Sequence, residues 1–313
     1  MIRIIFLGMS GSFSRRPLET LLTSGVKVGA VILPAASSSL DPLPRRVEPA
    51  QPALSALPVI NPYLHPNIIH LAWAQDIPVW EIGSLSDSST LALLAALKPD
   101  LIVVACFPFI LPTAVLHLPR YGCLNLHPSL LPAYRGPIPI FWMARQGERQ
   151  AGVTLHFMNE GLDSGDIVAQ TAFDWPDGIS GTELEQRCAV AGGVLLLEAV
   201  RHLAETGQLP RYPQPRKGSS YFSWPTVEDF VIPTDWEARR AFNFARAAAE
   251  WPLVIEVRER RGGEEARKWG NVSRFSIRTA IAYNNQESLD QPYLLSQDEI
   301  WIQFNPGVLR VKI

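Results

Sequence analysis

The first half of the chain alternates short apolar runs with segments in which apolar residues recur at helical spacing. The apolar runs predict strands at about residues 2–7, 27–33, 78–82, 100–106 and 122–128. The helical spacing predicts helices near residues 15–24, 65–75, 87–98 and 111–118. The run Leu101–Cys106 is apolar without interruption, which is typical of a strand buried on both faces. This alternation predicts an α/β fold of the Rossmann-like kind, a doubly wound and mostly parallel sheet covered by crossover helices.

The same pattern continues beyond His127 and then changes. It predicts a helix at 138–146, strands at 153–158 and 167–173, and a long helix at 181–205. Between Pro210 and Pro225 the composition changes to Pro, Ser, Arg and aromatic residues, which indicates a linker at 206–218. A helix near 236–249 and several short strands with turn signals follow, which predicts a small β-barrel. We therefore expect a first domain at 1–205, a linker at 206–218 and a second domain at 219–313.

The composition excludes several classes of protein. A chain of 313 residues with 47% hydrophobic and 19% charged residues is globular and long enough for two domains. The net charge of -2 provides no overall attraction to nucleic acid. Cys106, Cys123 and Cys188 have no C-x-x-C spacing, so we expect neither a disulfide framework nor a bound metal. Since no run of about 18 apolar residues occurs, a cytoplasmic protein without contact to a membrane is expected.

Polar side chains suited to acyl transfer lie around the end of the strand predicted at 122–128. Asn125 and His127 are two residues apart, so both side chains point to the same face of the strand. Both can donate hydrogen bonds to a carbonyl oxygen that becomes negative when the carbon is attacked. Asp163, in a glycine-flanked loop, would favour the charged imidazole and relay a proton through water. The residues therefore predict acyl transfer to an amine that attacks directly, without a Ser or Cys nucleophile.

Three ordered motifs extend this hypothesis. They are Asn125-Leu126-His127, Ser129-Leu130-Leu131-Pro132-Ala133-Tyr134-Arg135-Gly136, and Gly161-Leu162-Asp163-Ser164-Gly165-Asp166. Together they resemble the motifs of the folate-dependent formyltransferases, and the likeness extends loosely over residues 1 to about 205 and more weakly to the C-terminus. The resemblance implies that 10-formyltetrahydrofolate donates the formyl group, that Asn125, His127 and Asp163 are catalytic, and that the second domain is an oligonucleotide-binding-like barrel.

The resemblance also implies binding residues. The residues expected to bind the folate donor are Phe107, Ile110, Leu111, Met158, Gly161 and Leu162. Those expected to bind the second substrate are Ser10, Gly11, Ser129, Arg135 and Gly136. Arg135 suits a phosphate or carboxylate of that substrate. The remaining histidines have no metal-ligand spacing and are assigned no role; they are His65, His70, His117, His156 and His202.

The amine acceptor is less narrowly defined. The acceptor that the resemblance implies first is initiator methionyl-tRNA, which serves translation initiation. Members that formylate tRNA carry a basic insertion where this chain has the loop 33–48, which holds only Arg45 and Arg46. The segment 220–230 is closer to sugar-amine formyltransferases, so a nucleotide-sugar amine is the second possible acceptor. Two further functions stay open, hydrolysis of formyltetrahydrofolate and a non-enzymatic module that binds folate or RNA.

Overall fold

The chain forms two compact units, and it passes between them more than once. The computed structural model describes residues 2–36, 42–49, 67–260 and 269–313. The first unit comprises Met1–Arg135, Gly152–Ala172 and Glu185–Ser220, and the second comprises Gly136–Ala151, Phe173–Leu184 and Tyr221–Ile313. The predicted linker, 206–218, therefore lies in the first unit. Residues 37–41 of the loop 33–48, residues 65–66 of a predicted helix, and His65 lie outside the described residues.

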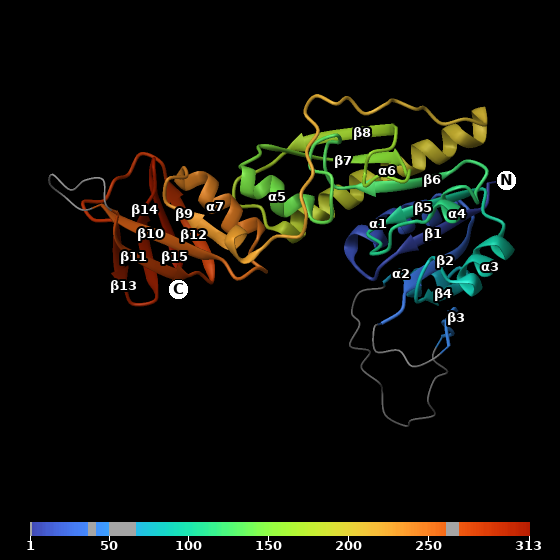
Figure 1. Ribbon diagram of the computed structural model, residues 1–313, viewed down its shortest axis with the longest axis horizontal. Helices are drawn as coiled ribbons and strands as arrows, with labels where there is room; N and C mark the ends of the chain where they lie inside the picture. The colour runs from blue at the N-terminus through green and yellow to red at the C-terminus, as the bar shows by residue number, and fades with distance from the viewer. Residues whose placement is uncertain (1, 37–41, 50–66, 261–268) are drawn as a thin grey trace, which may run out of the picture. The chain divides into compact units, whose positions relative to one another are not determined.

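An eight-stranded sheet is the main element of the fold. Its strands are β1 (Ile4–Gly8), β2 (Val28–Pro34), β3 (Arg45–Arg46), β4 (Val79–Ile82), β5 (Leu101–Ala105), β6 (Cys123–His127), β7 (Gln150–Phe157) and β8 (Ile167–Asp174). They lie in the order β3-β4-β2-β1-β5-β6-β7-β8 (Figure 1). The pairs β1–β2, β1–β5, β2–β4 and β5–β6 are parallel, whereas β3–β4 and β6–β7 are antiparallel. The mostly parallel sheet is confirmed, and β3 is an addition to it that the sequence did not predict.

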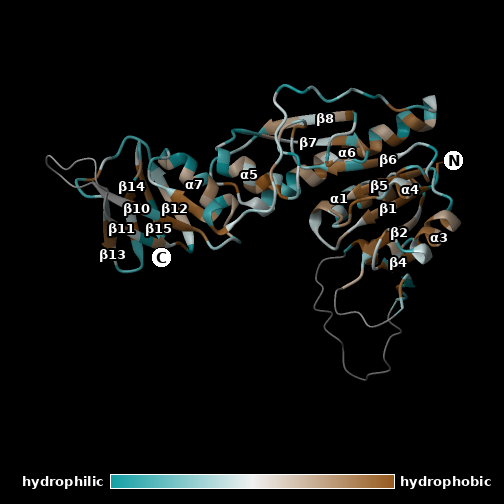
Figure 2. Cartoon of the chain, viewed as in Figure 1, coloured by the Kyte–Doolittle hydropathy of each residue, from teal (hydrophilic) through white to brown (hydrophobic). Residues whose placement is uncertain are grey.

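Helices cover both faces of this sheet. They are α1 (Ser12–Thr23), α2 (Ile68–Trp73), α3 (Ser88–Leu97), α4 (Thr113–Leu116) and α6 (Gly181–Thr206). α3 and α4 contribute Leu94 and Val115 to one buried cluster with the strands, which are hydrophobic along most of their length (Figure 2). On the other face, α6 packs on β6, since a Cβ added at Gly192 would lie 3.3 Å from Leu126 Cδ2. The doubly wound arrangement is thus confirmed, and no helix in the described ranges is long and apolar enough to cross a membrane.

The strand order decides where a ligand can bind. β1, β5 and β6 run parallel to one another, so the loops that follow them leave the same edge of the sheet. Ligands of open α/β sheets bind outside these carboxyl ends. The predicted residues Gly11, Phe107 and His127 all lie in or directly before these loops.

The second unit combines α5, from the middle of the chain, with the β-rich region at the C-terminus. Its elements are α5 (Pro139–Gln146), the short 3-10 helix η1 (Val227–Phe230), α7 (Ala238–Ala247), β9 (Val231–Pro233), β10 (Val254–Arg260), β11 (Trp269–Ser276), β12 (Thr279–Asn284), β13 (Tyr293–Ser296), β14 (Glu299–Gln303) and β15 (Val308–Lys312). The strands form a three-stranded sheet, β11-β10-β9, and a four-stranded sheet, β12-β15-β14-β13. A small β-rich region separate from the main sheet is therefore confirmed, and its strands are hydrogen-bonded as two sheets.

Asp177 explains why residues 173–184 belong to this second unit. Its carboxylate accepts hydrogen bonds from Arg239 Nε at 2.8 Å and Asn243 Nδ2 at 2.8 Å, both on α7, and from Tyr283 Oη at 2.7 Å, on β12. Partial burial raises the pKa of Asp177, but the three hydrogen bonds lower it by a larger amount. The pKa of Asp177 therefore lies below the ordinary value of an aspartate. One carboxylate thus joins three segments of the second unit.

We expect Asp177→Asn to lower the free energy of unfolding by about 1 kcal/mol at neutral pH, because a charged acceptor is replaced at a partly exposed site. Since the folded-state pKa is lowered, the loss should shrink as the pH falls through that pKa and the wild-type carboxylate becomes protonated. Urea denaturation at several pH values measures it. Asp174→Asn, at an exposed position in β8, is the control and should change little. Equal losses for both variants would contradict the assigned role.

Candidate active site

The strand β6 positions Asn125 and His127. Both side chains lie on the same face because strand residues alternate between faces. In the antiparallel pairing with β7, Asn125 is opposite His156 and His127 is opposite Thr154. His127 is only 4% exposed, so its polar atoms depend on protein partners.

The loop between β7 and β8 carries Asp163 back toward these residues. Phe157 N donates to Asp166 O at 2.8 Å, which closes the loop at its base. Gly165 is needed there, since an added Cβ would lie 1.9 Å from Phe157 O. Asp163 itself has a φ of 47°, in the left-handed region that non-glycine residues seldom adopt. The position of its carboxylate therefore depends on a tight and unusual backbone path.

The three residues predicted to be catalytic meet. Asp163 Oδ1 lies 3.4 Å from Asn125 Nδ2, and Asp163 Oδ2 lies 3.7 Å from His127 Nδ1. One carboxylate thus faces both the amide and the imidazole, which is the arrangement that the sequence motifs imply. Long contacts of this kind in the absence of ligand commonly shorten when a substrate is bound.

The hydrogen bonds of His127 define how its ring is oriented. Nε2 lies 2.8 Å from Tyr134 O, and because a carbonyl oxygen can only accept, Nε2 carries a proton. Nδ1 is then the nitrogen that faces Asp163, and it carries a proton only when the ring is charged. A charged His127 would therefore present one N–H toward the space beside Asp163 and Asn125.

His156, to which the sequence assigned no role, is a second polar partner of Asn125, beside Asp163. It is 1% exposed, and its Nδ1 donates to Phe157 O at 2.8 Å. Burial, and then the nearby His127, lower the pKa of His156 to about 4, so the ring is neutral at pH 7. Nε2 is therefore unprotonated and accepts from Asn125 Nδ2 at 3.1 Å. His156 thus fixes which way the Asn125 amide points.

One signal in the sequence could have identified His156. It is a titratable residue in the otherwise apolar end of the strand predicted at 153–158, and a buried polar group of this kind requires a hydrogen-bonding partner. The identity of that partner follows only from the pairing register of β6 with β7.

The residues predicted to bind the folate donor differ in exposure. Phe107 and Met158 are partly buried against the core cluster, and Leu111 is a member of it. Ile110 and Leu162, in contrast, are 71% and 48% exposed, and Gly161 is exposed as well. The loops after β5 and β7 therefore present large apolar side chains to solvent.

The residues predicted to bind the second substrate also fall into groups. Ser10 and Gly11 are exposed between β1 and α1, and Gly11 is the N-cap of that helix. Ser129 is fully buried, and its hydroxyl donates to Ala133 O at 2.8 Å, so in this structure it holds its own loop.

Arg135 and Gly136 follow in the same loop. Arg135 is half-buried, and its guanidinium donates to Gln214 Oε1 from Nε at 3.1 Å and from a terminal nitrogen at 2.6 Å. Gly136 has a φ of 114°, and an added Cβ would lie 2.0 Å from Phe222 O, so this position requires glycine for packing.

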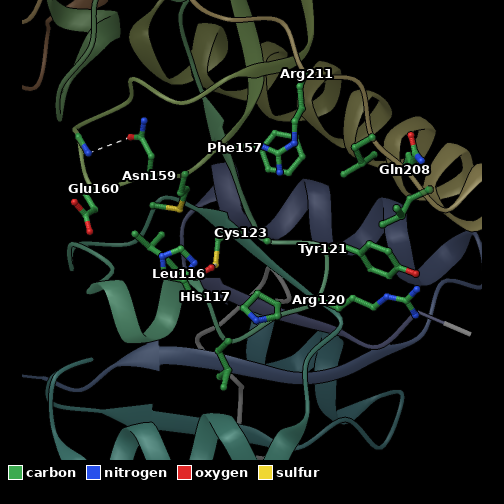
Figure 3. A pocket seen from close by; sticks show the side chains of 17 residues that line it. Leu116, His117, Arg120, Tyr121, Cys123, Phe157, Asn159, Glu160, Gln208 and Arg211 are labelled. Carbon is green, nitrogen blue, oxygen red and sulfur yellow. Dashed lines mark hydrogen bonds between the residues drawn. The ribbon is translucent and has the colours of Figure 1, made fainter.

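A cavity of about 1020 Å³ opens beside the loop that carries Asp163. Its walls include His117–Cys123, Met158–Gly161, Gln208, Leu209 and Arg211. Arg211 covers the ring of Phe157, 3.5 Å from its centroid (Figure 3). Asn125, His127 and Asp163 do not line the cavity, but Met158 and Gly161, two of the residues expected to bind the folate donor, do.

Comparison with known proteins agrees with this geometry. A sequence profile of the formyl transferase family matches residues 2–200. The chain belongs to the formyl transferase family. It is therefore an N-formyltransferase, as the motifs implied. Within the described ranges, no group of three or more His, Cys, Asp or Glu residues could hold a metal ion.

Individual relatives extend the comparison beyond that match. A methionyl-tRNA formyltransferase of Syntrophus aciditrophicus is 36% identical, covering 80% of this chain and 74% of the relative. Among solved structures, an N-formyltransferase from Helicobacter canadensis, in complex with folinic acid and dTDP-3-aminofucose, has a TM-score of 0.69 at 17% identity, covering 100% of this chain and 99% of that one. A methionyl-tRNA formyltransferase from Clostridium thermocellum has a TM-score of 0.51 at 13% identity, covering 88% and 100%. At such identities the two structures support the fold alone.

The lowered pKa of His156 predicts a pH-dependent stability. Between pH 6.5, the ordinary value, and about 4, the unfolded chain binds a proton that the folded chain does not, so the free energy of unfolding should fall as the pH falls. In His156→Gln, the dependence of stability on pH should be shallower by up to about 1.4 kcal/mol per pH unit in this range. Chemical denaturation from pH 4 to pH 7 tests this. His202→Gln, at an exposed position on α6, is the control, and an unchanged slope in the His156 variant would contradict the pKa assignment.

Proposed function

We propose that the chain transfers the formyl group of 10-formyltetrahydrofolate to the amino group of methionyl-tRNA. The observation that carries this proposal is the meeting of Asn125, His127 and Asp163, with Asp163 at 3.4 Å from the amide and 3.7 Å from the imidazole. The relative from Syntrophus aciditrophicus, a methionyl-tRNA formyltransferase 36% identical to this chain, supports the acceptor.

The exposed apolar residues fit the donor. Ile110 and Leu162 expose large apolar side chains to solvent. On the same two loops, Phe107 and Met158 are half-buried and apolar. A flat pterin ring would gain by covering such side chains, since ligand sites are mostly apolar with few polar groups. Gly161 would allow close approach of the backbone. When bound, the donor supplies the formyl group.

The polar residues would stabilise the charge that develops during transfer. A charged His127 would donate from Nδ1 to the formyl oxygen. Asn125 would redirect to the same oxygen the amide hydrogen that it now donates, over a long 3.4 Å from nitrogen to oxygen, to Asp163 Oδ1. As the amine nitrogen forms its bond to the formyl carbon, the C=O electron pair moves to the oxygen, and the bond from carbon to N10 breaks when that pair returns. Asp163, through water, would carry the proton from the amine toward N10. Ser10, Gly11 and Arg135 remain the proposed contacts of the acceptor.

An amino-sugar nucleotide is the second candidate acceptor. The two arginines of the loop 33–48 are both paired with carboxylates, Arg45 with Glu81 at 2.6 Å and Arg46 with Glu48 at 3.0 Å. Paired arginines give little net attraction for the phosphates of a tRNA. This observation favours a small acceptor of the kind named for the Helicobacter canadensis complex, dTDP-3-aminofucose.

An acceptor assay separates the candidates. With a labelled formyl donor, we expect labelled methionyl-tRNA, and the apparent tRNA affinity should fall steeply with salt because phosphate contacts release counterions. Labelling of a dTDP-amino sugar, with little dependence on salt, would replace the tRNA proposal with the second candidate. Formate release without any amine would instead support hydrolysis.

We expect His127→Ala to lower the turnover number by about 100-fold to 1000-fold, because it removes a donor to the developing negative oxygen. Steady-state kinetics with saturating donor and acceptor measure it. His202→Ala, on the exposed side of α6, should keep wild-type turnover. Near-normal turnover of the His127 variant would remove this residue from the mechanism.

A further inference from the structure

The segment that the composition identifies as a linker is attached to the first unit at several points. Tyr212 pairs with Ile167 at the start of β8, with Tyr212 N donating to Ile167 O at 2.9 Å and Ile167 N donating to Tyr212 O at 2.8 Å. Residues 211–219 are exposed, with one exception, Gln214. A partly buried glutamine in an exposed segment indicates that its side chain has specific partners.

The amide of Gln214 uses all of its hydrogen-bonding capacity on the active-site loops. Its Nε2 donates to Asp163 O at 2.8 Å and to Gly165 O at 2.7 Å. Its Oε1 accepts two hydrogen bonds from the Arg135 guanidinium, at 3.1 Å and 2.6 Å. Two donors and two acceptors are the full inventory of a neutral amide, and a carboxylate or an apolar side chain cannot reproduce them.

These bonds act on the backbone that orients the Asp163 carboxylate. Asp163 has the left-handed φ of 47°, which is unfavourable for a residue with a Cβ and persists only where the surroundings enforce it. Gln214 holds the carbonyl groups of Asp163 itself and of Gly165, two residues further on. The rotation of the backbone at Asp163 is therefore constrained from outside the loop.

Ser220, two residues after the linker 206–218, holds the loop that follows His127. Ser220 Oγ accepts from Tyr134 N at 2.8 Å, and Ser220 O accepts from Arg135 N at 3.0 Å. Tyr134 O in turn accepts the proton of His127 Nε2. Gln214 and Ser220 thus connect the loop of Asp163 with the loop that orients His127.

We propose that Gln214 is a positioning residue for formyl transfer. Its amide keeps Asp163 in the left-handed conformation, and so sets the distances from the carboxylate to Asn125 and His127, while it joins this loop to Arg135. The inference rests on the proposed function, because the positioned carboxylate has a catalytic role only if Asp163 relays the proton.

Two substitutions separate the two halves of the amide. Gln214→Met keeps the length of the side chain and removes all four hydrogen bonds. Gln214→Glu keeps the oxygen that accepts from Arg135 and replaces the donor to the two carbonyl groups with a second acceptor. Gln208→Met is the matched control, a glutamine in an exposed position between α6 and Tyr212.

Hydrogen exchange tests the attachment without depending on activity. In the full-length protein, we expect the amides of residues 159–166 to exchange about 10-fold faster in Gln214→Met and Gln214→Glu than in wild type, because the loop loses two hydrogen bonds. The control should exchange as wild type does, and amides of β1 and β5 should exchange at the wild-type rate in all proteins, which separates a local opening of the loop from a general loss of stability. Unchanged exchange of residues 159–166 in both variants would overturn the proposal.

Kinetics test the consequence for the reaction. The turnover number should fall by about 10-fold to 100-fold in both variants, with a smaller change in the KM of the donor, because a misplaced catalytic group costs rate more than binding. Wild-type turnover in Gln214→Glu would assign the role to the Arg135 contact and overturn the proposed action on Asp163. Faster exchange with wild-type turnover in both variants would also overturn it.

The two proposals fail in different ways. If the wild-type chain transfers no formyl group to any acceptor, the proposed function fails, and Gln214 then has no reaction for which to position Asp163, whatever the exchange experiment shows about the loop. If wild type is active and the variants match it in turnover, only the role of Gln214 is lost.

Discussion

Asn125 and His156 face each other across the antiparallel pairing of β6 with β7, and the geometry of the site follows from this register. A shift of one residue would turn Asn125 away from His156 and place Leu124 or Leu126 opposite His156 instead. The register also sets where β7 ends and where its loop begins. Because Phe157 and Asp166 close that loop, Asp163 returns to the face on which Asn125 and His127 lie. Side chains from two strands and one loop thus converge on one place.

Burial gives this cluster a fixed pattern of donors and acceptors. His127 and His156 are almost inaccessible, so each ring must satisfy its N–H group within the protein, and both do so on backbone carbonyl groups. The remaining nitrogen of each ring then has a defined function. His156 Nε2 accepts from Asn125, whereas His127 Nδ1 faces Asp163. The backbone thereby orients both rings before any substrate is bound, which is the preorganisation on which electrostatic catalysis depends.

The sequence predicted what depends on local spacing and missed what depends on pairing between distant segments. The strands and helices of the sheet lie within a few residues of their predicted positions because periodicity of two or of 3.6 is a local property. Asn125 and His127 could be placed on one face for the same reason. His156 could not be connected with Asn125, because the pairing register of β6 with β7 cannot be predicted from the sequence of either strand alone. Nor could the sequence reveal that Asp177 would join residues 173–184 to α7 and β12.

The segment around Gln214 shows why composition is an incomplete guide to a linker. Pro213 and Pro215 flank the glutamine, and proline fixes φ of its own residue and restricts the residue before it, so the backbone at Gln214 has little freedom to lose. A stiff exposed segment can therefore hold one side chain in place at a low entropic cost. The family profile matches residues 2–200 and ends before this point, although the loop that carries Asp163 hydrogen-bonds to it. The smallest part of the chain that contains all the hydrogen bonds described for the Asp163 loop thus extends at least to Gln214, beyond the residues that the family profile matches.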